Sequence, residues 1–204
     1  MKPFGLSRNL VLAALAIAVF WSVPAAAENA ATPVSALTEP YNIPETDLVM
    51  TLPVTWGDIP EDVMAGVDAN SIFGLEIADE DELAELQSGP DEPFAVMLIS
   101  KEGPLYGTPV QELKTVERGL KISRWVTWVI GSGMEVTRPV QAMEIDGATA
   151  ATMSFLSGQE GSHTVMSMTY IVVEDETIFI VDAAPKDTDA VRVLNEMRAS
   201  IRLK

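Results

Sequence analysis

Residues 135–183, EVTRPVQAMEIDGATAATMSFLSGQEGSHTVMSMTYIVVEDETIFIVDA, decide the fold because they read as consecutive strands joined by short turns. Asp146-Gly147 is a residue pair that favours the tight turn of a β-hairpin. The GQEG stretch at 158–161 and Asp175-Glu176 supply the next two turns. The strands predicted between them are Glu135–Ile145, Ala148–Ser157, Ser162–Glu174 and Thr177–Ala183. Because short turns join antiparallel neighbours, the stretch predicts an antiparallel meander.

A long helix is predicted directly before this meander. Thr108 is a favourable N-cap, Pro109 suits the first helical position, and Gln111 completes the spacing of a capping box. Apolar residues then recur at helical spacing as far as Val129. The glycines of Gly131-Ser132-Gly133 would end the helix.

The rest of the chain adds a closing helix and earlier strands. A helix from about Thr188 should bury one apolar stripe. That stripe is Ala190, Val193, Leu194, Met197 and Ile201, and the arginines expected outside it are Arg192, Arg198 and Arg202. The earlier strands are predicted at Asp47–Leu52, Ser71–Ile77 and Phe94–Ser100. Runs of strands with segregated helices predict one α+β domain with a mostly antiparallel sheet.

The N-terminus has the features of a secretory signal. Lys2 and Arg8 precede an apolar stretch, Leu10–Val23, and Ala25-Ala26-Ala27 gives a cleavage pattern of small residues. The apolar stretch is shorter than a typical membrane span of about 20 residues, so we expect no stable membrane insertion after cleavage, with an uncleaved anchor as the alternative. This divides the chain into a signal peptide at 1–27, a flexible leader at 28–40 and a domain at 41–204. The predicted location is the periplasm, with secretion as the alternative.

Charge and cysteine content exclude several classes of protein. The chain has 13 basic and 30 acidic residues, a net charge of −17. Signal cleavage would remove Lys2 and Arg8, so the mature chain would carry a net charge of −19. Such a charge repels nucleic acid and favours cationic partners. The absence of cysteine from the sequence excludes disulfides, thiolate metal sites and cysteine nucleophiles.

Residues 76–92, EIADEDELAELQSGPDE, are the most acidic stretch. Asp79, Asp81 and Glu82 are candidate ligands for a divalent metal ion. An EF-hand loop starting at Asp79 fails because leucine, alanine and proline occupy three of its required positions. A short helix capped by Asp79, with Glu82 three residues on, explains the acids better, because carboxylates are favourable at a helix start. Metal binding and an acidic docking surface stay as alternatives.

The other candidate site residues are three methionines, which could bind a metal ion, and one histidine, which could take part in catalysis. Met166 and Met168 lie on one face of a predicted strand, and pairing of Ser157 with Ser162 would place Met153 opposite Met166. Thioethers bind Cu(I), although methionine more commonly fills a core, here under a helix.

A hydrolase would have to use His163, the only histidine, which is expected at the rim of a hairpin. The sequence contains no G-x-S-x-G nucleophile motif. Trp125 and Trp128, three residues apart at the end of the long helix, suit core packing better than the lining of an apolar pocket or a partner groove.

Several landmarks in sequence order resemble the PsbP-like superfamily. They are Tyr41 with the strand at 47–52, the turn Pro53-Val54-Thr55-Trp56, the turn Ile145-Asp146-Gly147-Ala148, the strand at 177–181, and Met197-Arg198-Ala199-Ser200-Ile201. The resemblance covers residues 41–204 and implies an α/β/α sandwich with a central antiparallel sheet flanked by helices. Members are mostly accessory, assembly or binding proteins without catalytic activity, and they share no active-site motif to transfer. The leader at 28–40 has no feature equivalent to the functional N-terminus of photosynthetic members, so a photosystem role is not implied.

Together these features predict an exported, non-catalytic accessory protein that needs no cofactor. It would bind another envelope protein through a basic surface of that partner. A metal or small-ligand binder is the first alternative, and a hydrolase that uses His163 is the second.

Overall fold

The computed structural model describes residues 37–59, 82–130, 134–159 and 162–204. The expected signal peptide, most of the leader, the predicted strand at 71–77 and Gly131-Ser132-Gly133 lie outside these ranges. The N-terminal strands are β1 (Leu37–Asn42), β2 (Leu48–Pro53), β3 (Gly57–Asp58), β4 (Glu82–Gln87) and β5 (Val96–Glu102). After helix α4 (Pro109–Ile130) follow β6 (Glu135–Ile145), β7 (Ala148–Gln159), β8 (Ser162–Val173), β9 (Glu176–Pro185), α5 (Asp189–Ala199) and β10 (Arg202–Leu203).

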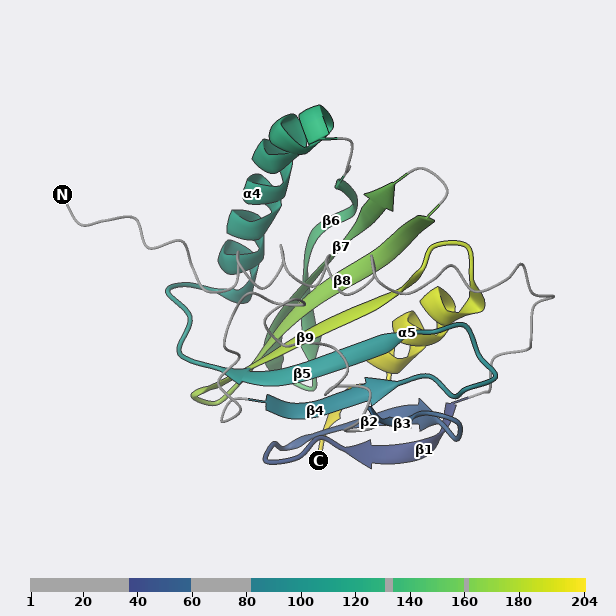
Figure 1. The fold of residues 1–204 in the computed structure, drawn as a ribbon. Helices are drawn as coiled ribbons and strands as arrows, with labels where there is room; N and C mark the ends of the chain where they lie inside the picture. The colour runs from purple at the N-terminus through teal and green to yellow at the C-terminus, as the bar shows by residue number, and fades with distance from the viewer. Residues whose placement is uncertain (1–36, 60–81, 131–133, 160–161) are drawn as a thin grey trace.

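The strands form two antiparallel sheets. The large sheet has the order β3-β4-β5-β9-β8-β7-β6, and the small one has the order β1-β2-β10. After β5 the chain crosses one face of the large sheet as α4 and enters at the far edge as β6. It then returns strand by strand until β9 pairs with β5 (Figure 1). This crossover places α4 over β6, β7 and β8.

Turn chemistry explains the meander. Asp146 and Gly147 both have positive φ, 49° and 93°, as a type I′ hairpin turn requires. Pairing in the next hairpin extends to Gln159 and Ser162, so β7 is longer than predicted at that end, whereas β8 starts at Ser162 as predicted. In the last hairpin Val173 pairs with Glu176. The turn is therefore Glu174-Asp175, and the predicted turn at Asp175-Glu176 is one residue too late.

The predicted capping box is present at the start of α4. The backbone N–H of Gln111 donates to Thr108 Oγ1 at 3.3 Å, and the backbone N–H of Thr108 donates to Gln111 Oε1 at 2.9 Å. These bonds satisfy donors that have no partner within the helix. Leu113, Val116 and Leu120 then recur on the buried face of α4.

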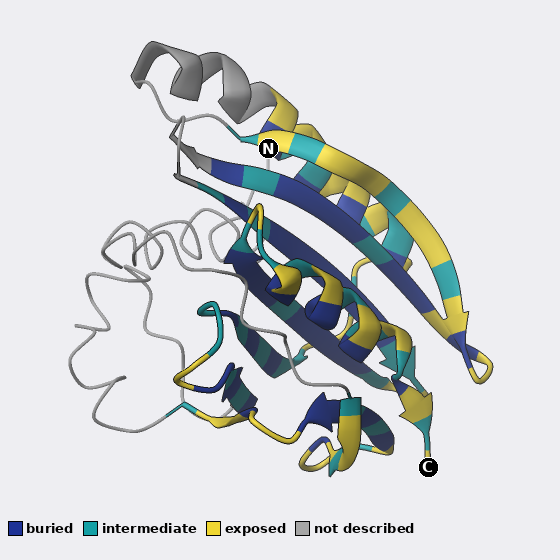
Figure 2. Ribbon diagram, turned by 90° about the vertical axis from the view of Figure 1, so that its right-hand side faces the viewer, coloured by how far each residue is buried: buried dark blue, intermediate teal, exposed yellow. Residues whose placement is uncertain are grey.

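The large sheet is covered on both faces, which confirms the expected α+β sandwich. One core lies between the sheet and α4, and it includes Met153, Tyr170 and Phe179. The adjacent residues Ile171 and Ile178 point the other way. They belong to a second core closed by α5 and the small sheet. Because both faces are covered, β8 and β9 are buried along most of their length (Figure 2).

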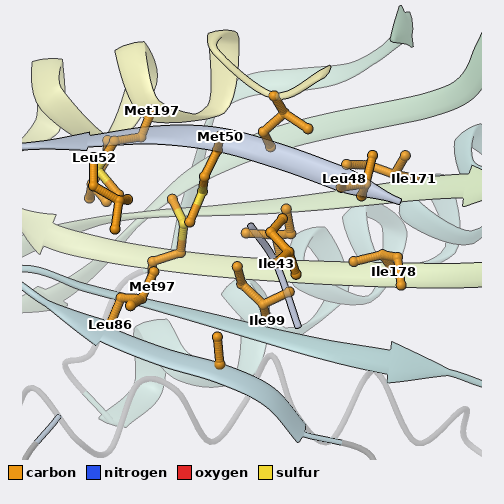
Figure 3. Close-up of a cluster of buried hydrophobic side chains, with 14 of the residues drawn as sticks. Ile43, Leu48, Met50, Leu52, Leu86, Met97, Ile99, Ile171, Ile178 and Met197 are labelled. Carbon is orange, nitrogen blue, oxygen red and sulfur yellow. The ribbon is translucent and has the colours of Figure 1, made fainter. Parts of the chain in front are cut away.

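The second core joins the two sheets and α5. Met50 and Leu52 of β2 face Met97 and Leu86 of the large sheet, and Met197 of α5 lies beside them (Figure 3). All five side chains are buried. Burying a leucine or methionine side chain stabilises a fold by roughly 1.5–3 kcal/mol, so this cluster is a major source of stability.

Two N-terminal expectations are corrected. The acidic helix predicted within 76–92 is wrong for residues 82–87, which form β4 and pair antiparallel with β5. Ala84 and Leu86 alternate into the core, so pairing and burial outweigh the helix-favouring composition. The last four residues of the expected leader belong to β1 and pair with β2, so folded structure begins before Tyr41.

The edge strand β6 is irregular and mostly exposed. Its pairing with β7 shifts register between Val136 and Arg138 and again between Arg138 and Gln141, around Pro139. Bulges and proline prevent an exposed edge from pairing with another strand. In the ranges that the structure describes, neither helix has the length and apolar character needed to cross a bilayer.

Candidate functional site

The carboxylates proposed as metal ligands are not placed as a cluster. Asp79 and Asp81 lie outside the described residues, and Glu82 is the first residue of β4. Glu85 is half-buried in the same strand, and Glu92, in the loop after it, accepts a hydrogen bond from Thr55 at 2.6 Å. Within the part of the chain described, no three carboxylate or histidine side chains form a group that could hold a metal ion.

The three candidate methionines share one face of the sheet beneath α4. Met153, Met166 and Met168 are each at most 1% exposed. Met153 pairs with Met168, whereas Phe155 pairs with Met166, so the predicted pairing of Met153 with Met166 is wrong. The cause is the shorter turn, which pairs Ser157 with Thr164 instead of Ser162. The thioethers fill the α4 core, as methionine commonly does.

His163 is the second residue of β8, next to the β7–β8 turn, as expected for the rim of a hairpin. It pairs with Gly158 and is partly exposed. Its backbone carbonyl accepts a hydrogen bond from the N–H of Lys186 at 2.8 Å, which ties the β9–α5 connection to the sheet. Gly131-Ser132-Gly133 and the side chains of Trp125 and Trp128 lie outside what the structure describes.

A buried ion pair between Asp182 and Arg198 was missed from the sequence. Asp182 of β9 accepts a hydrogen bond from Arg198 of α5, and their side chains are 3% and 11% exposed. Arg198 also donates to Asn195 Oδ1 at 2.5 Å. Arg198 lies outside the buried apolar stripe of α5, as predicted, but its side chain reaches the buried Asp182, which was not predicted. The available signal was Asp182 itself, a single acid within the apolar run FIVDAAP.

Two serines extend this pair across the sheet. Asp182, Ser167 and Ser154 occupy neighbouring positions on three adjacent strands. Ser167 is hydrogen-bonded to Asp182, and the hydroxyls of Ser154 and Ser167 lie 2.9 Å apart. A serine has one hydroxyl proton, so donation from Ser167 to Asp182 leaves Ser154 to donate to Ser167. We name this set, with Arg198 and Asn195, the Asp182 network.

Opposing effects act on the ionisation of Asp182. Burial raises the pKa of the Asp182 carboxyl above its ordinary value, because the charged form loses its hydration. The charge of Arg198 and the hydrogen bonds from Arg198 and Ser167 act to lower that pKa. The network therefore compensates a charge that would be costly in the core. Asp182, Ser167 and Ser154 are buried, whereas Arg198 and Asn195 are partly exposed at the surface of α5.

The β1–β2 and β6–β7 turns, both of which carry acidic residues, meet at the C-terminal end of the chain. The described non-glycine residues with positive φ are Glu45, Asp146 and Glu174, each in a turn. The C-terminal strand is held at this end, because the N–H of Leu203 donates to Asp146 Oδ2 at 2.9 Å and Lys204 Nζ donates to the Thr46 carbonyl at 2.6 Å. This end therefore presents carboxylates on tightly held backbone.

Comparison with known proteins gave matches at the level of structure. No family model matches the sequence, and no curated protein matches it. The solution structure of cyanobacterial PsbP (CyanoP) from Synechocystis sp. PCC 6803 matches with a TM-score of 0.51 and 13% identity, over 87% of this chain and 99% of that one.

Two further solved structures match at lower scores. The Ran-binding protein Mog1p of Saccharomyces cerevisiae has a TM-score of 0.47 and 10% identity, over 82% of this chain and 96% of that one. LpqN of Mycobacterium tuberculosis, described as involved in cell envelope biogenesis, has a TM-score of 0.47 and 12% identity, over 77% and 83%. The match to CyanoP carries the structural conclusion, and it agrees with the landmarks in the sequence. The chain has the PsbP-like fold.

Proposed function

We propose that this chain is an exported accessory protein that acts by binding another protein of the cell envelope and catalyses no reaction. Residues 1–27 would direct export, residues 28–36 would link the signal to the first strand, and the folded domain would work in the periplasm. The PsbP-like fold supports a binding role, because the resemblance implies accessory and assembly proteins.

The observation that carries the proposal is the acidic exterior of the fold. The chain has 30 acidic residues, yet Asp182 is the only charged residue among the buried polar side chains of the described ranges. The other described acids are therefore available to solvent or to a partner. A surface of one sign raises the rate of encounter with a partner of the opposite sign. The partner would accordingly present lysine and arginine.

Affinity purification from native cells tests this proposal. The full chain should retain a discrete envelope protein at low ionic strength and lose most of it at about 1 M salt, where charges are screened over roughly 3 Å. An unrelated periplasmic protein of similar net charge is the control. Recovery of the same proteins by this control would refute a specific partner.

Copper binding remains a second candidate because three thioethers share one face beneath α4. Anaerobic thermal unfolding with Cu(I) tests it, since a ligand that binds only the folded state raises the melting temperature. Ca²⁺ and Mn²⁺ test the carboxylates at 79, 81 and 82 in the same way. An unchanged melting temperature at concentrations up to 100 μM would reject each site.

A further inference from the structure

The loop Gly103–Gly107 between β5 and α4 presents a fully exposed aromatic side chain. Tyr106 is 100% exposed, whereas the preceding Leu105 packs against the α4 core. Val54, at 65%, is the other large apolar side chain that is exposed in the described ranges. A tyrosine can bury 150–250 Å² against a partner, and tyrosines are enriched among the residues that dominate binding energies.

Side chains of α4 hold this loop in place. The backbone N–H of Tyr106 donates to Glu112 Oε1 at 3.1 Å. The next residue, Gly107, lies so close to Gln111 that a side chain there would clash with the Gln111 amide oxygen. That oxygen is already engaged with the backbone of Thr108 in the capping box. Tyr106 is thus displayed on a fixed backbone, which lowers the entropic cost of ordering the loop on binding.

The surroundings of the loop are acidic. The loop starts after Glu102, which pairs with Thr177 near the β8–β9 turn. That turn, Glu174-Asp175, lies at the same end of the sheet as the loop (Figure 1). The nearby Lys101 is bound to Glu176 in an ion pair. A cationic side chain brought to Tyr106 would meet an aromatic face with the Glu112 carboxylate beside the loop backbone, and the acidic Glu174-Asp175 turn lies at the same end of the sheet.

We propose that the Gly103–Gly107 loop is the docking point for a basic segment of the envelope partner, with Tyr106 as its anchor. This inference rests on the proposed function and assigns that function to one end of the molecule. An arginine of the partner stacks on the Tyr106 ring, and neighbouring basic residues face Glu102 and the Glu174-Asp175 turn.

Site-specific photocrosslinking in native cells tests the assignment. The full chain carries benzoylphenylalanine at position 106 or, as a matched control, at the exposed position 54, and crosslinked peptides are sequenced by mass spectrometry. We expect a discrete adduct at 106 at least several times more abundant than at 54, with the crosslinked partner peptide rich in lysine and arginine. Equal adducts at the two positions, or a partner peptide without excess basic residues, would overturn the inference.

A second measurement tests whether Tyr106 itself contributes to binding of the partner. In the affinity purification of the full chain, Tyr106→Ala should reduce the recovered partner roughly tenfold or more, as loss of a binding hot spot does, while Tyr106→Phe keeps the stacking face and most of the complex. An unchanged amount of recovered partner with Tyr106→Ala would contradict the inference but leave the proposed function intact. Absence of an adduct at 106 together with no partner retained in the affinity purification would contradict both.

Discussion

Replacing Arg198 by methionine should strongly destabilise the fold at neutral pH. Methionine keeps much of the apolar stem but removes the charge that compensates Asp182, whose side chain is 3% exposed. Removing one partner of a buried ion pair costs about 3–5 kcal/mol. For a domain of this size each kcal/mol lowers the melting temperature by about 2–4 °C, so we expect a decrease of roughly 6–20 °C.

The pH dependence identifies the cause of this loss. Without Arg198, the hydrogen bond from Ser167 is left to oppose the effect of burial on the pKa of Asp182, so the folded-state pKa rises further above that of the unfolded chain. A carboxyl with a raised folded-state pKa favours the folded state when protonated, and that contribution is lost as pH rises through the folded-state value. The deficit of Arg198→Met should therefore be larger at pH 8 than at pH 5.

Urea unfolding followed by circular dichroism at both pH values measures the deficit. The double variant Asp182→Asn/Arg198→Met should recover most of the lost stability, because the uncompensated charge is gone. Arg192→Met is the control, since Arg192 forms an exposed ion pair with Glu196 in the same helix, and little change is expected. A loss below about 1 kcal/mol for Arg198→Met, or a deficit equal at both pH values, would refute the role assigned to the pair.

Three further substitutions test the local arguments. Gly147→Ala, at a φ of 93°, should cost about 1 kcal/mol or more in chemical unfolding, and an unchanged midpoint would contradict the type I′ turn. Thr108→Ala removes the capping bond to Gln111 and should cost about 1 kcal/mol, with the exposed helical Lys114→Ala as the control. Met153→Ala should cost about 2–5 kcal/mol because it leaves a cavity beneath α4; a loss under 1 kcal/mol would mean that the thioether does not fill the core.

The elements that the sequence predicted well are those specified by local chemistry. Glu135–Ile145 was predicted with the bounds it has, because Asp146-Gly147 fixes the turn that follows. The start of α4 was predicted because Thr108 and Gln111 bond to each other's backbone within four residues. In both cases the determining contacts lie within a few positions of the chain.

The errors concern contacts between distant residues. Glu82–Gln87 contains good helix formers but becomes a strand because β5 supplies a pairing edge that local propensity cannot show. The register of Met153 depended on a turn that is two residues shorter than assumed. Asp182 and Arg198 are 16 positions apart, and only the docking of α5 on β9 brings their charges together.

The path of α4 across the sheet also has a consequence for the order of folding. In the central pair β5–β9, Val96 meets Ala183, 87 residues later, and β2 meets β10 only at Arg202. The meander, β1–β2 and β4–β5 can each pair between neighbours, whereas β5 and β2 meet β9 and β10 only near the end of the chain. We therefore expect the large sheet to close between β5 and β9 only after almost all of the chain has been made.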